Sequence, residues 1–325
     1  MKNNTAEKII QYIKEKKRVT GKEIADYFEI SRQGLFKHLN KLLENNIITK
    51  IGKPPMVFYF IQEFKKIKKE NCNLPIKLKN LIKNNFLIIT PSGEKKQGMD
   101  AFSYWCQKQN LPLIKTALEY EKTLKKYQIF NRGGLINGIK KLKNTFNKIW
   151  LDYLYYLDFY SIERFGKTKL GQLLLYAKQS QDKTLIKELI NIIKPQIQNI
   201  IKKHKIDAVG FIPPTVKREV QFMRELQKNL HLKSRIISIV KIKTQVPVPQ
   251  KTLNKLEDRI ENASNTIIVD EQSTFKNILL IDDAVGSGAT LNETAKQIKD
   301  KKIAKKIVGV SITGSFKGFD VISEV

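Results

Sequence analysis

The segment that most constrains this chain lies near its C-terminus, where an apolar run is followed by two acids and a glycine-containing turn. Residues 277–281 are mostly apolar and predict a short buried strand, and Asp282 and Asp283 follow it directly. The chain then turns through Gly-Ser-Gly at residues 286–288, and a helix is expected to begin near Thr290. This order indicates a ligand site at the carboxyl end of a strand.

The chemistry of this segment favours a phosphorylated sugar. Glycines let backbone N–H groups close round an anion, and a helix N-terminus favours a phosphate. An acidic pair repels a phosphate but suits sugar hydroxyls or a magnesium ion, so the two together predict a 5-phosphoribosyl ligand. Ser287 and Thr290 add hydroxyl donors to the same turn.

Other phosphate-binding loops fail on particular residues. A Walker A loop requires Gly-Lys-Ser/Thr, which this turn does not contain. A dinucleotide-binding fingerprint would lack its third glycine, because Leu291 follows Ala289 and Thr290, and the acidic pair would face the pyrophosphate. A Walker B strand has the apolar run and the acids, but not the glycine turn and the helix.

From about residue 167 the chain alternates between strand and helix patterns. Such alternation predicts a parallel, doubly wound α/β sheet, in which ligands bind at the carboxyl ends of the strands. The expected strands are 208–212, 235–240, 266–269, 277–281 and 307–312, and the expected helices are 170–177, 184–203, 220–230 and 291–301.

The segment 279–290 resembles the binding signature for 5-phosphoribosyl-1-pyrophosphate (PRPP) of type I phosphoribosyltransferases. The flanking sequence is most similar to ComF-like members of that family, at the Ile-Pro-Pro of residues 212–214 and in a Gln…Leu…Arg…Asn segment at residues 250–262. The resemblance implies a phosphoribosyltransferase-type domain over residues 167–325. It also implies that PRPP binds together with Mg²⁺. The residues that it implies for the 5′-phosphate are Ala284, Val285, Gly286, Ser287, Gly288, Ala289 and Thr290.

The same resemblance implies that Asp282 and Asp283 are the catalytic acids, which hold the ribose hydroxyls and are candidate contacts of the magnesium ion. The pyrophosphate side departs from the family. Gly286 stands where the family often has Thr, and the segment 215–222 is shorter and lacks an arginine-rich run. The residues predicted for the pyrophosphate side are Pro214, Thr215, Lys217 and Arg218. Lys217 and Arg218 equally fit an ordinary solvated loop.

Residues 1–62 have the element order of a winged helix-turn-helix. An amphipathic helix comes first, and Thr20 with Glu23 predicts a capping box at the start of a second helix. Ser31 predicts the N-cap of a third helix, residues 32–45, with a leucine stripe on one face. Two β segments follow, as in a wing.

This order resembles bacterial and archaeal winged-helix DNA-binding domains, whose third helix enters the major groove of double-stranded DNA. Arg32, Gln33 and Lys37 lie off the leucine stripe, and Arg and Gln can read guanine and adenine. Lys50 and Lys53 would flank the wing and meet phosphates. We expect a homodimer, because two such helices would bind a palindromic site. The alternative is a winged helix that binds a protein partner instead of DNA.

Residues 63–166 carry no chemical motif. Helical patterns near residues 102–127, and an aromatic stretch at residues 150–160 whose aromatic residues recur at helical spacing, predict a mostly helical linking region. Aromatic stripes of this kind are more typical of a core or a dimer interface than of a ligand cage. The role of this region stays open.

The net charge of +29 suggests a polyanionic partner, although a composition rich in Lys, Ile and Asn is also typical of A/T-rich coding. No stretch approaches the about 20 apolar residues of a membrane span, and no apolar leader segment opens the chain. The two cysteines, Cys72 and Cys106, lack metal-ligand spacing and suit a reduced compartment. We therefore expect a cytoplasmic protein with no membrane contact.

These features predict a DNA-binding transcriptional regulator with a phosphoribosyltransferase-type domain that senses PRPP, an architecture similar to that of purine-operon repressors. The alternative is an active phosphoribosyltransferase that transfers the phosphoribosyl group to a nucleobase or a related amine. The winged helix and the departures on the pyrophosphate side favour the regulator, and the intact acidic pair permits either.

Overall fold

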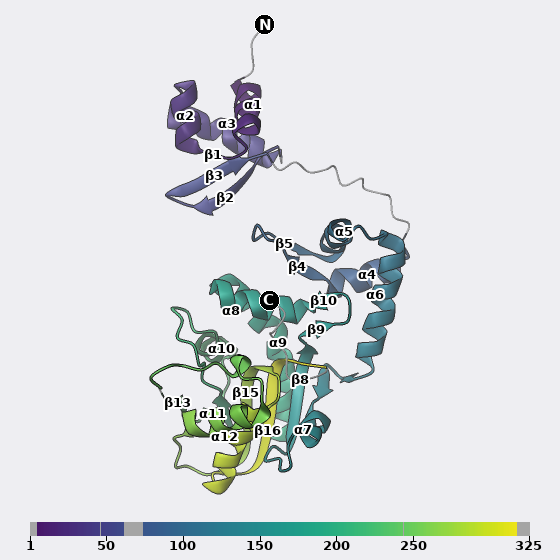
Figure 1. Cartoon of the computed structure of the whole chain (residues 1–325), viewed down its shortest axis with the longest axis vertical. Coiled ribbons are helices and arrows are strands. Elements are labelled where there is room, and N and C mark those ends of the chain that lie inside the picture. Colours follow the sequence, from purple (N-terminus) through teal and green to yellow (C-terminus); the bar gives the residue numbers. More distant parts are fainter. Residues whose placement is uncertain (1–4, 46, 62–73, 243, 317–325) are drawn as a thin grey trace. The chain divides into compact units, whose positions relative to one another are not determined.

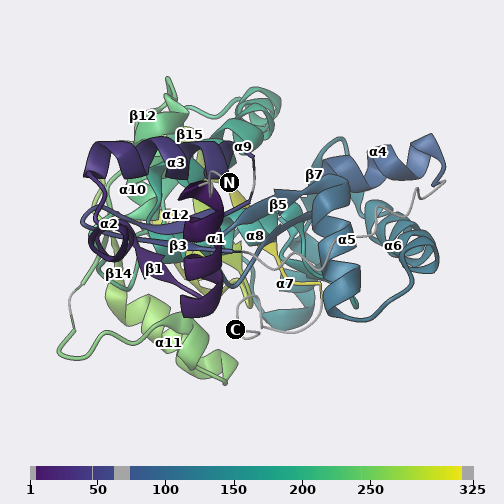
Figure 2. The same ribbon diagram turned by 90° about the horizontal axis from the view of Figure 1, so that it is seen from above.

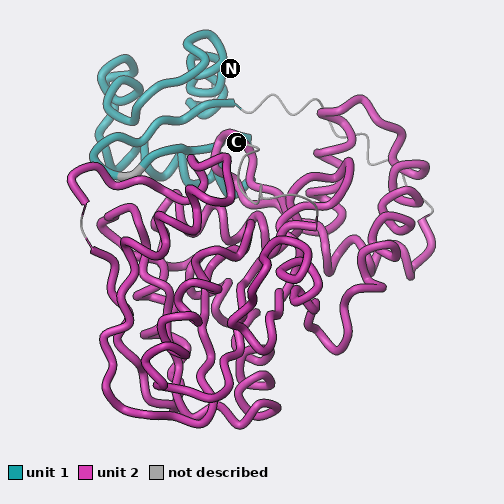
Figure 3. Tube along the Cα trace, turned by 60° about the horizontal axis from the view of Figure 1, so that its bottom comes forward, with its two compact units in different colours: residues 1–73 teal, residues 74–325 magenta. Residues whose placement is uncertain are grey.

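The computed structural model of the chain (Figure 1) describes residues 5–45, 47–61, 74–242 and 244–316. The chain divides into two compact units, residues 1–73 and residues 74–325, which have different colours in Figure 3. The second unit contains residues 74–166, where the sequence predicted a linking region, together with the C-terminal α/β elements.

The described part of unit 1 has three helices and a three-stranded antiparallel sheet. Thr20 Oγ1 accepts a hydrogen bond from Glu23 N at 3.2 Å and Glu23 Oε2 accepts one from Thr20 N at 2.6 Å, which confirms the predicted capping box. Ser31 Oγ accepts from Gly34 N at 3.2 Å, so Ser31 caps the third helix as predicted. The elements are α1 (Thr5–Lys16), β1 (Val19–Thr20), α2 (Gly21–Phe28), α3 (Arg32–Glu44), β2 (Thr49–Lys53) and β3 (Met56–Phe60), with strand order β1-β3-β2.

The apolar stripe of α3 enters the core of unit 1. Leu35, Leu39 and Leu42 are buried, and Leu43 is half-buried against the same cluster, as the spacing predicted. Because these leucines occupy one face of the helix, the polar residues of α3 remain on its other face, in solvent.

A seven-stranded sheet forms the centre of unit 2 among the residues that the structure describes. Its order is β12-β11-β15-β16-β8-β7-β6, in which the five strands from β12 to β8 are parallel and β7 and β6 are antiparallel. The strands are β6 (Asn131–Arg132), β7 (Leu135–Asn137), β8 (Tyr153–Phe159), β11 (Ala208–Phe211), β12 (Arg235–Ile236), β15 (Phe275–Val285) and β16 (Ala304–Gly314).

The strand order creates a topological switch point. From β11 the chain crosses through α10 (Phe222–Leu230) to β12 on one side, and it later returns to β15 on the other side of β11. The carboxyl ends of β11 and β15 are therefore neighbours, while the segments that follow them lead in opposite directions. Ligands bind at this position in parallel α/β sheets.

Helices cover both faces of the sheet. The crossovers from β11 to β12 and from β15 to β16 run in opposite directions, so right-handed connections place α10 and α12 (Ala289–Asp300) on opposite faces. On the α10 face, α8 (Lys169–Ser180) and α9 (Lys183–His204) share one apolar cluster with Leu279 and Ile281 of β15. The remaining elements near the sheet are α7 (Ile139–Thr145), β9 (Ser161–Ile162), β10 (Gly166–Lys167), β13 (Ile239–Lys241), η1 (Gln250–Thr252), α11 (Leu256–Thr266) and β14 (Ile267–Val269).

The N-terminal part of unit 2 is a helical group in which α4, α5 and α6 lie together (Figure 2). Its core is aromatic: the ring of Phe86 meets those of Phe102 and Tyr120 edge to face, with centroids 5.0 and 5.3 Å apart. The elements are α4 (Ile76–Asn85), β4 (Leu87–Ile89), β5 (Lys95–Gln97), α5 (Gly98–Lys108) and α6 (Leu113–Gln128).

The structure corrects the prediction that the second aromatic stretch, residues 150–160, is helical. Residues 153–159 form β8, which pairs with β16 on one side and β7 on the other. Leu154 to Leu157 are all buried, because this strand is covered on both faces. A strand of this kind has a continuous apolar sequence, which periodicity alone does not distinguish from a buried helix.

A second correction concerns the predicted strand 266–269. The strand exists as β14, but it pairs antiparallel with β13 in a separate two-stranded sheet rather than joining the parallel sheet. The predicted strand 235–240 is split accordingly, because β12 belongs to the main sheet and β13 pairs with β14. Pairing partners are set by tertiary contacts, which the pattern of either segment does not contain.

Candidate functional site

A cavity of about 280 Å³ lies at the switch point. Its walls come from the end of α8, the segment that follows β11, the turn between β15 and α12, and the residues around Gln250 and Arg259. Every residue of the predicted motif from Asp282 to Thr290 lines it. The structure thus brings the acidic pair and the glycine turn into one cavity.

The acidic pair lies within β15, which continues to Val285 instead of ending at Ile281. Asp282 is in register with Ser311 of β16, and Asp282 Oδ1 accepts a hydrogen bond from Asp283 N at 2.8 Å. Burial raises the pKa of Asp282 above the usual range of an aspartate, and the neighbouring charge of Asp283 is the second cause. A cation, or hydroxyl donors from a ligand, would stabilise the charged form of this pair.

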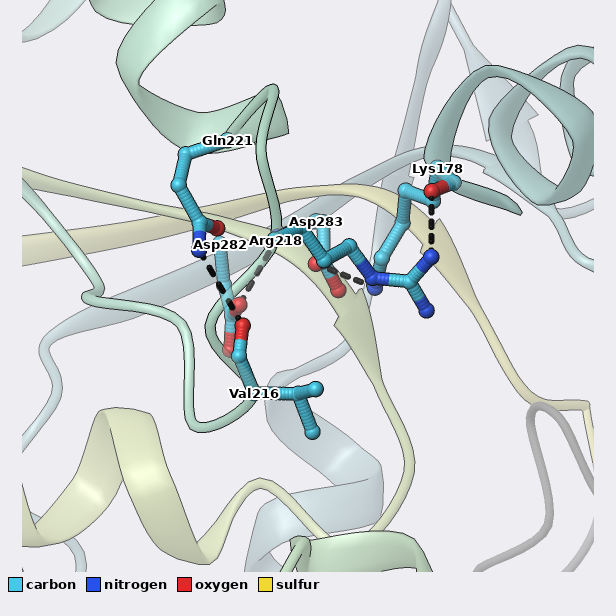
Figure 4. Close-up of polar contacts among 6 residues, drawn as sticks. All are labelled: Lys178, Val216, Arg218, Gln221, Asp282 and Asp283. Atoms are coloured by element: carbon cyan, nitrogen blue, oxygen red, sulfur yellow. Dashed lines mark hydrogen bonds and ion pairs between the residues drawn. The ribbon is translucent and has the colours of Figure 1, made fainter. Parts of the chain in front are cut away.

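Lys178 of α8 places a cation next to this acidic pair (Figure 4). Lys178 Nζ lies 2.5 Å from Asp283 Oδ2, with the two side chains 27% and 19% exposed. The carbonyl oxygen of Lys178 accepts a hydrogen bond from Arg218 Nη1 at 2.8 Å, so the end of α8 also contacts the segment after β11. In that segment Gln221 Nε2 donates to the carbonyl oxygen of Val216 at 3.2 Å.

Gly288 allows the turn to approach α7 closely. Its φ of +88° lies in the left-handed region, and a Cβ atom at this position would meet Leu142 Cδ2 of α7. The helix α12 begins at the next residue, Ala289, with its N-terminus at the cavity. A side-chain hydrogen bond fixes the turn further, because Ala289 N donates to Ser287 Oγ at 3.3 Å.

The α7 helix, which the sequence placed in the linking region, forms the wall behind this turn. Lys141 of α7 donates a hydrogen bond to Ser315 Oγ, and Ser315 N donates to the carbonyl oxygen of Val285 at 3.2 Å. Burial, with the nearby charge of Arg259 second, lowers the pKa of Lys141 to about 8. Residues outside the predicted phosphoribosyltransferase-type segment therefore support the glycine turn.

Three of the four residues predicted for the pyrophosphate side line the cavity: Pro214, Thr215 and Arg218. Lys217 is exposed and is not one of the lining residues. Arg259 and Gln250, which belong to the segment that resembles ComF-like proteins, also line the cavity. Gln250 Nε2 donates a hydrogen bond to the Arg259 carbonyl oxygen at 2.9 Å.

The sequence did not identify several lining residues. Lys178 and Gln179 lie in the last turn of α8, Tyr160 follows β8, and Lys241 ends β13. No local pattern marks them, since each is more than 40 residues from the acidic pair along the chain. Burial lowers the pKa of Lys241, and the charge of Asp282 acts against this effect.

Two adjacent carboxylates would suit a magnesium ion that arrives with a ligand. No group of three or more His, Cys, Asp or Glu side chains in the described part of the chain is placed to hold a metal. Asp282 and Asp283 offer carboxylate oxygens, and Mg²⁺ commonly takes its other ligands from water and substrate phosphates. These two residues would hold the ion, whose chemistry is to neutralise phosphate charge.

In unit 1, the residues predicted for DNA contact lie on the solvent side. Arg32, Gln33 and Lys37 of α3 and Lys50 of β2 are exposed. The side chain of Lys53 lies outside what the structure describes. Phe36, between the polar residues of α3, is 49% exposed and so presents an apolar ring on the same helix.

Comparison with known proteins identifies the N-terminal region. A family model described as "HTH domain" matches residues 5–53. Unit 1 carries a helix-turn-helix domain. No curated protein matches the chain.

Among solved structures, a hypoxanthine phosphoribosyltransferase from Staphylococcus aureus is similar at 15% sequence identity. The similar region covers 42% of this chain and 80% of that protein, with a TM-score of 0.23. A TM-score this low does not establish a shared fold. In the described part of the chain, no helix is both long and apolar enough to cross a membrane.

Proposed function

We propose that this chain is a DNA-binding transcriptional regulator whose unit 2 binds PRPP, together with Mg²⁺, as a signal. The helix-turn-helix match and the exposed polar residues of α3 support the DNA-binding part. The observation that carries the ligand part is the cavity at the switch point, where the acidic pair and the glycine turn meet at the carboxyl end of β15.

Within this proposal each part of the cavity has a role. Asp282 and Asp283 accept hydrogen bonds from the ribose hydroxyls, and the backbone N–H groups of residues 284–290 with the N-terminus of α12 hold the 5′-phosphate. Thr215 and Arg218 face the pyrophosphate from the segment after β11. The magnesium ion, when bound, neutralises phosphate charge next to the acidic pair.

The ligand part is tested by calorimetric titration of the full-length chain with PRPP in the presence of Mg²⁺. The wild type is expected to bind, and a variant with both Asp282→Asn and Asp283→Asn is expected to lose the binding while unit 1 stays folded. If the wild type releases no heat and shows no protection by PRPP in thermal unfolding, the ligand proposal is wrong.

The DNA part is tested by fluorescence anisotropy with duplex DNA from the chain's own promoter, with and without PRPP. Joint replacement of Arg32, Gln33 and Lys37 by Ala should abolish binding, because these side chains would meet base edges and phosphates. Lys8→Ala removes one charge from the exposed side of α1 and is the control. A homodimer is expected to bind a palindromic site, and absence of binding to any promoter fragment would refute the proposal.

The second candidate is an active phosphoribosyltransferase. Arg218 and Thr215 lie in the same cavity as the acidic pair, which is the arrangement needed to hold a pyrophosphate leaving group. In that reaction a nitrogen nucleophile of a nucleobase or amine bonds to the anomeric carbon, and the bond from that carbon to pyrophosphate breaks. Release of pyrophosphate from PRPP that depends on an added nucleobase would favour this candidate over a pure sensor.

A further inference from the structure

Lys178 and Asp283 form an ion pair inside the cavity between two distant segments of the chain. The two residues are 105 positions apart along the chain, yet Lys178 Nζ lies 2.5 Å from Asp283 Oδ2 inside the ligand cavity. Both side chains are less than a third exposed, so solvent screens this ion pair less than a pair on the surface. The ammonium group therefore occupies a position that a ligand-borne cation would otherwise take.

The acidic pair needs a counter-charge before any ligand arrives. Asp282 and Asp283 are adjacent in β15, and their carboxylates repel each other in a partly buried cavity. Lys178 meets this need from the α8 side. On the other side, Lys241 lines the same cavity and interacts with the charge of Asp282.

The backbone of Lys178 is fixed independently of its side chain. Its carbonyl oxygen accepts from Arg218 Nη1 at 2.8 Å, and Gln181, the C-cap of α8, accepts a hydrogen bond on Oε1 from Val220 N at 2.7 Å. The end of α8 is thus held by the segment that follows β11. Only the flexible lysine side chain has to move for Asp283 to become free.

We propose that Lys178 is a specificity-determining residue, an internal counter-cation that a magnesium–phosphoribosyl ligand displaces from Asp283 and that a free divalent cation displaces poorly. This inference deepens the proposed function and rests on it for the identity of the ligand. A free cation must expel the ammonium group without compensation. A cation that arrives with a polyanion leaves the released ammonium group within the same cavity, where ligand phosphates provide a new partner.

The inference predicts opposite effects on two kinds of ligand. Lys178→Met removes the competing charge while keeping most of the side-chain length. The affinity for a free divalent cation should therefore rise about tenfold or more, which corresponds to ~1.4 kcal/mol of binding free energy. The same variant should bind PRPP with Mg²⁺ more weakly than the wild type, because the released ammonium group is absent. Lys178→Arg should behave like the wild type towards free cations.

The experiment uses the full-length chain and Mn²⁺ as the probe, with free Mn²⁺ measured by electron paramagnetic resonance in the absence of PRPP. Lys169→Met is the matched control: it lies on the same helix, and its Nζ donates instead to the Asn84 carbonyl oxygen at 3.3 Å, outside the cavity lining. It should bind Mn²⁺ as the wild type does. Adding Asp283→Asn to Lys178→Met should abolish the gain, which assigns the bound ion to the acidic pair.

A calorimetric titration of the same proteins with PRPP and Mg²⁺ distinguishes a failure of the proposed function from a failure of the role proposed for Lys178. If the wild type does not bind PRPP, the proposed function fails, and the Mn²⁺ measurement still judges Lys178. If Lys178→Met binds Mn²⁺ no more tightly than the wild type, Lys178 is not a counter-cation, whatever PRPP does. Circular dichroism checks the fold of each variant, and Lys178→Gln replaces the Met variant if that one is unfolded.

Discussion

Replacing Tyr156 by Phe is expected to stabilise unit 2, an effect that few substitutions of a buried residue have. Tyr156 is 2% exposed, and its hydroxyl group, which lies against Gly138, has no hydrogen-bond partner among the described residues. A buried polar group without a partner costs about 1–3 kcal/mol. Removing the hydroxyl returns most of this cost but loses a few packing contacts, so the free energy of unfolding should rise by about 1–2 kcal/mol.

The neighbouring Tyr155 provides a control with the opposite sign. Tyr155 directly precedes Tyr156 in the chain and lies on the opposite face of β8, and its hydroxyl group lies 3.0 Å from His204 Nε2. Tyr155→Phe also removes a tyrosine hydroxyl group, but this change breaks a buried hydrogen bond. The free energy of unfolding should therefore fall by about 0.5–1.5 kcal/mol.

Urea unfolding of the full-length chain, followed by tryptophan fluorescence, measures both effects. The two tryptophans of the chain, Trp105 and Trp150, both belong to unit 2, so the signal reports on that unit. If Tyr156→Phe lowers the free energy of unfolding as Tyr155→Phe does, the Tyr156 hydroxyl group has a partner in solution and the reasoning is wrong.

Three further predictions concern a helix cap, a buried histidine and the glycine turn. Thr20→Ala should destabilise unit 1 by about 1 kcal/mol, because Glu23 N loses its acceptor; the thermal transition of unit 1 by circular dichroism measures this, and an unchanged transition would contradict it. Burial lowers the pKa of His204, so the fold favours its neutral form, and the stability of unit 2 should fall as the pH drops below the unfolded value of about 6.5; His204→Gln should flatten this slope in urea titrations at several pH values. Gly288→Ala should weaken PRPP binding about tenfold or more in calorimetry, since the left-handed φ costs ~1–2 kcal/mol and the new Cβ meets Leu142; equal affinity would show that the turn tolerates a side chain.

Features that depend on neighbouring residues in the chain were predictable. The capping box of Thr20 and Glu23 and the leucine stripe of α3 each lie within one helix, where spacing alone decides which groups meet. The glycine turn was predictable for the same reason, and so was the start of α12, which lies one or two residues before the expected position. Side-chain and backbone chemistry over a few residues was enough to locate them.

Features that depend on distant segments were not. Nothing in the pattern of residues 150–160 shows that β8 is covered on both faces, and nothing in residues 266–269 shows that β14 pairs with β13. The ion-pair partner of Asp283 comes from α8, and the residue that a Cβ atom at Gly288 would meet is Leu142 of α7. Each of these contacts joins residues far apart in the chain, and a local sequence pattern contains no information about such distances.

The amino-acid sequence by itself therefore determined the chemical identity of the two candidate sites, the acidic pair with its glycine turn and the polar face of α3, because each is written in one contiguous segment. The tertiary structure alone decided which other side chains complete the cavity, including Tyr160, Lys178 and Lys241. The physical reason is that the order of strands β11 and β15 in the sheet brings together the ends of segments that the chain keeps far apart.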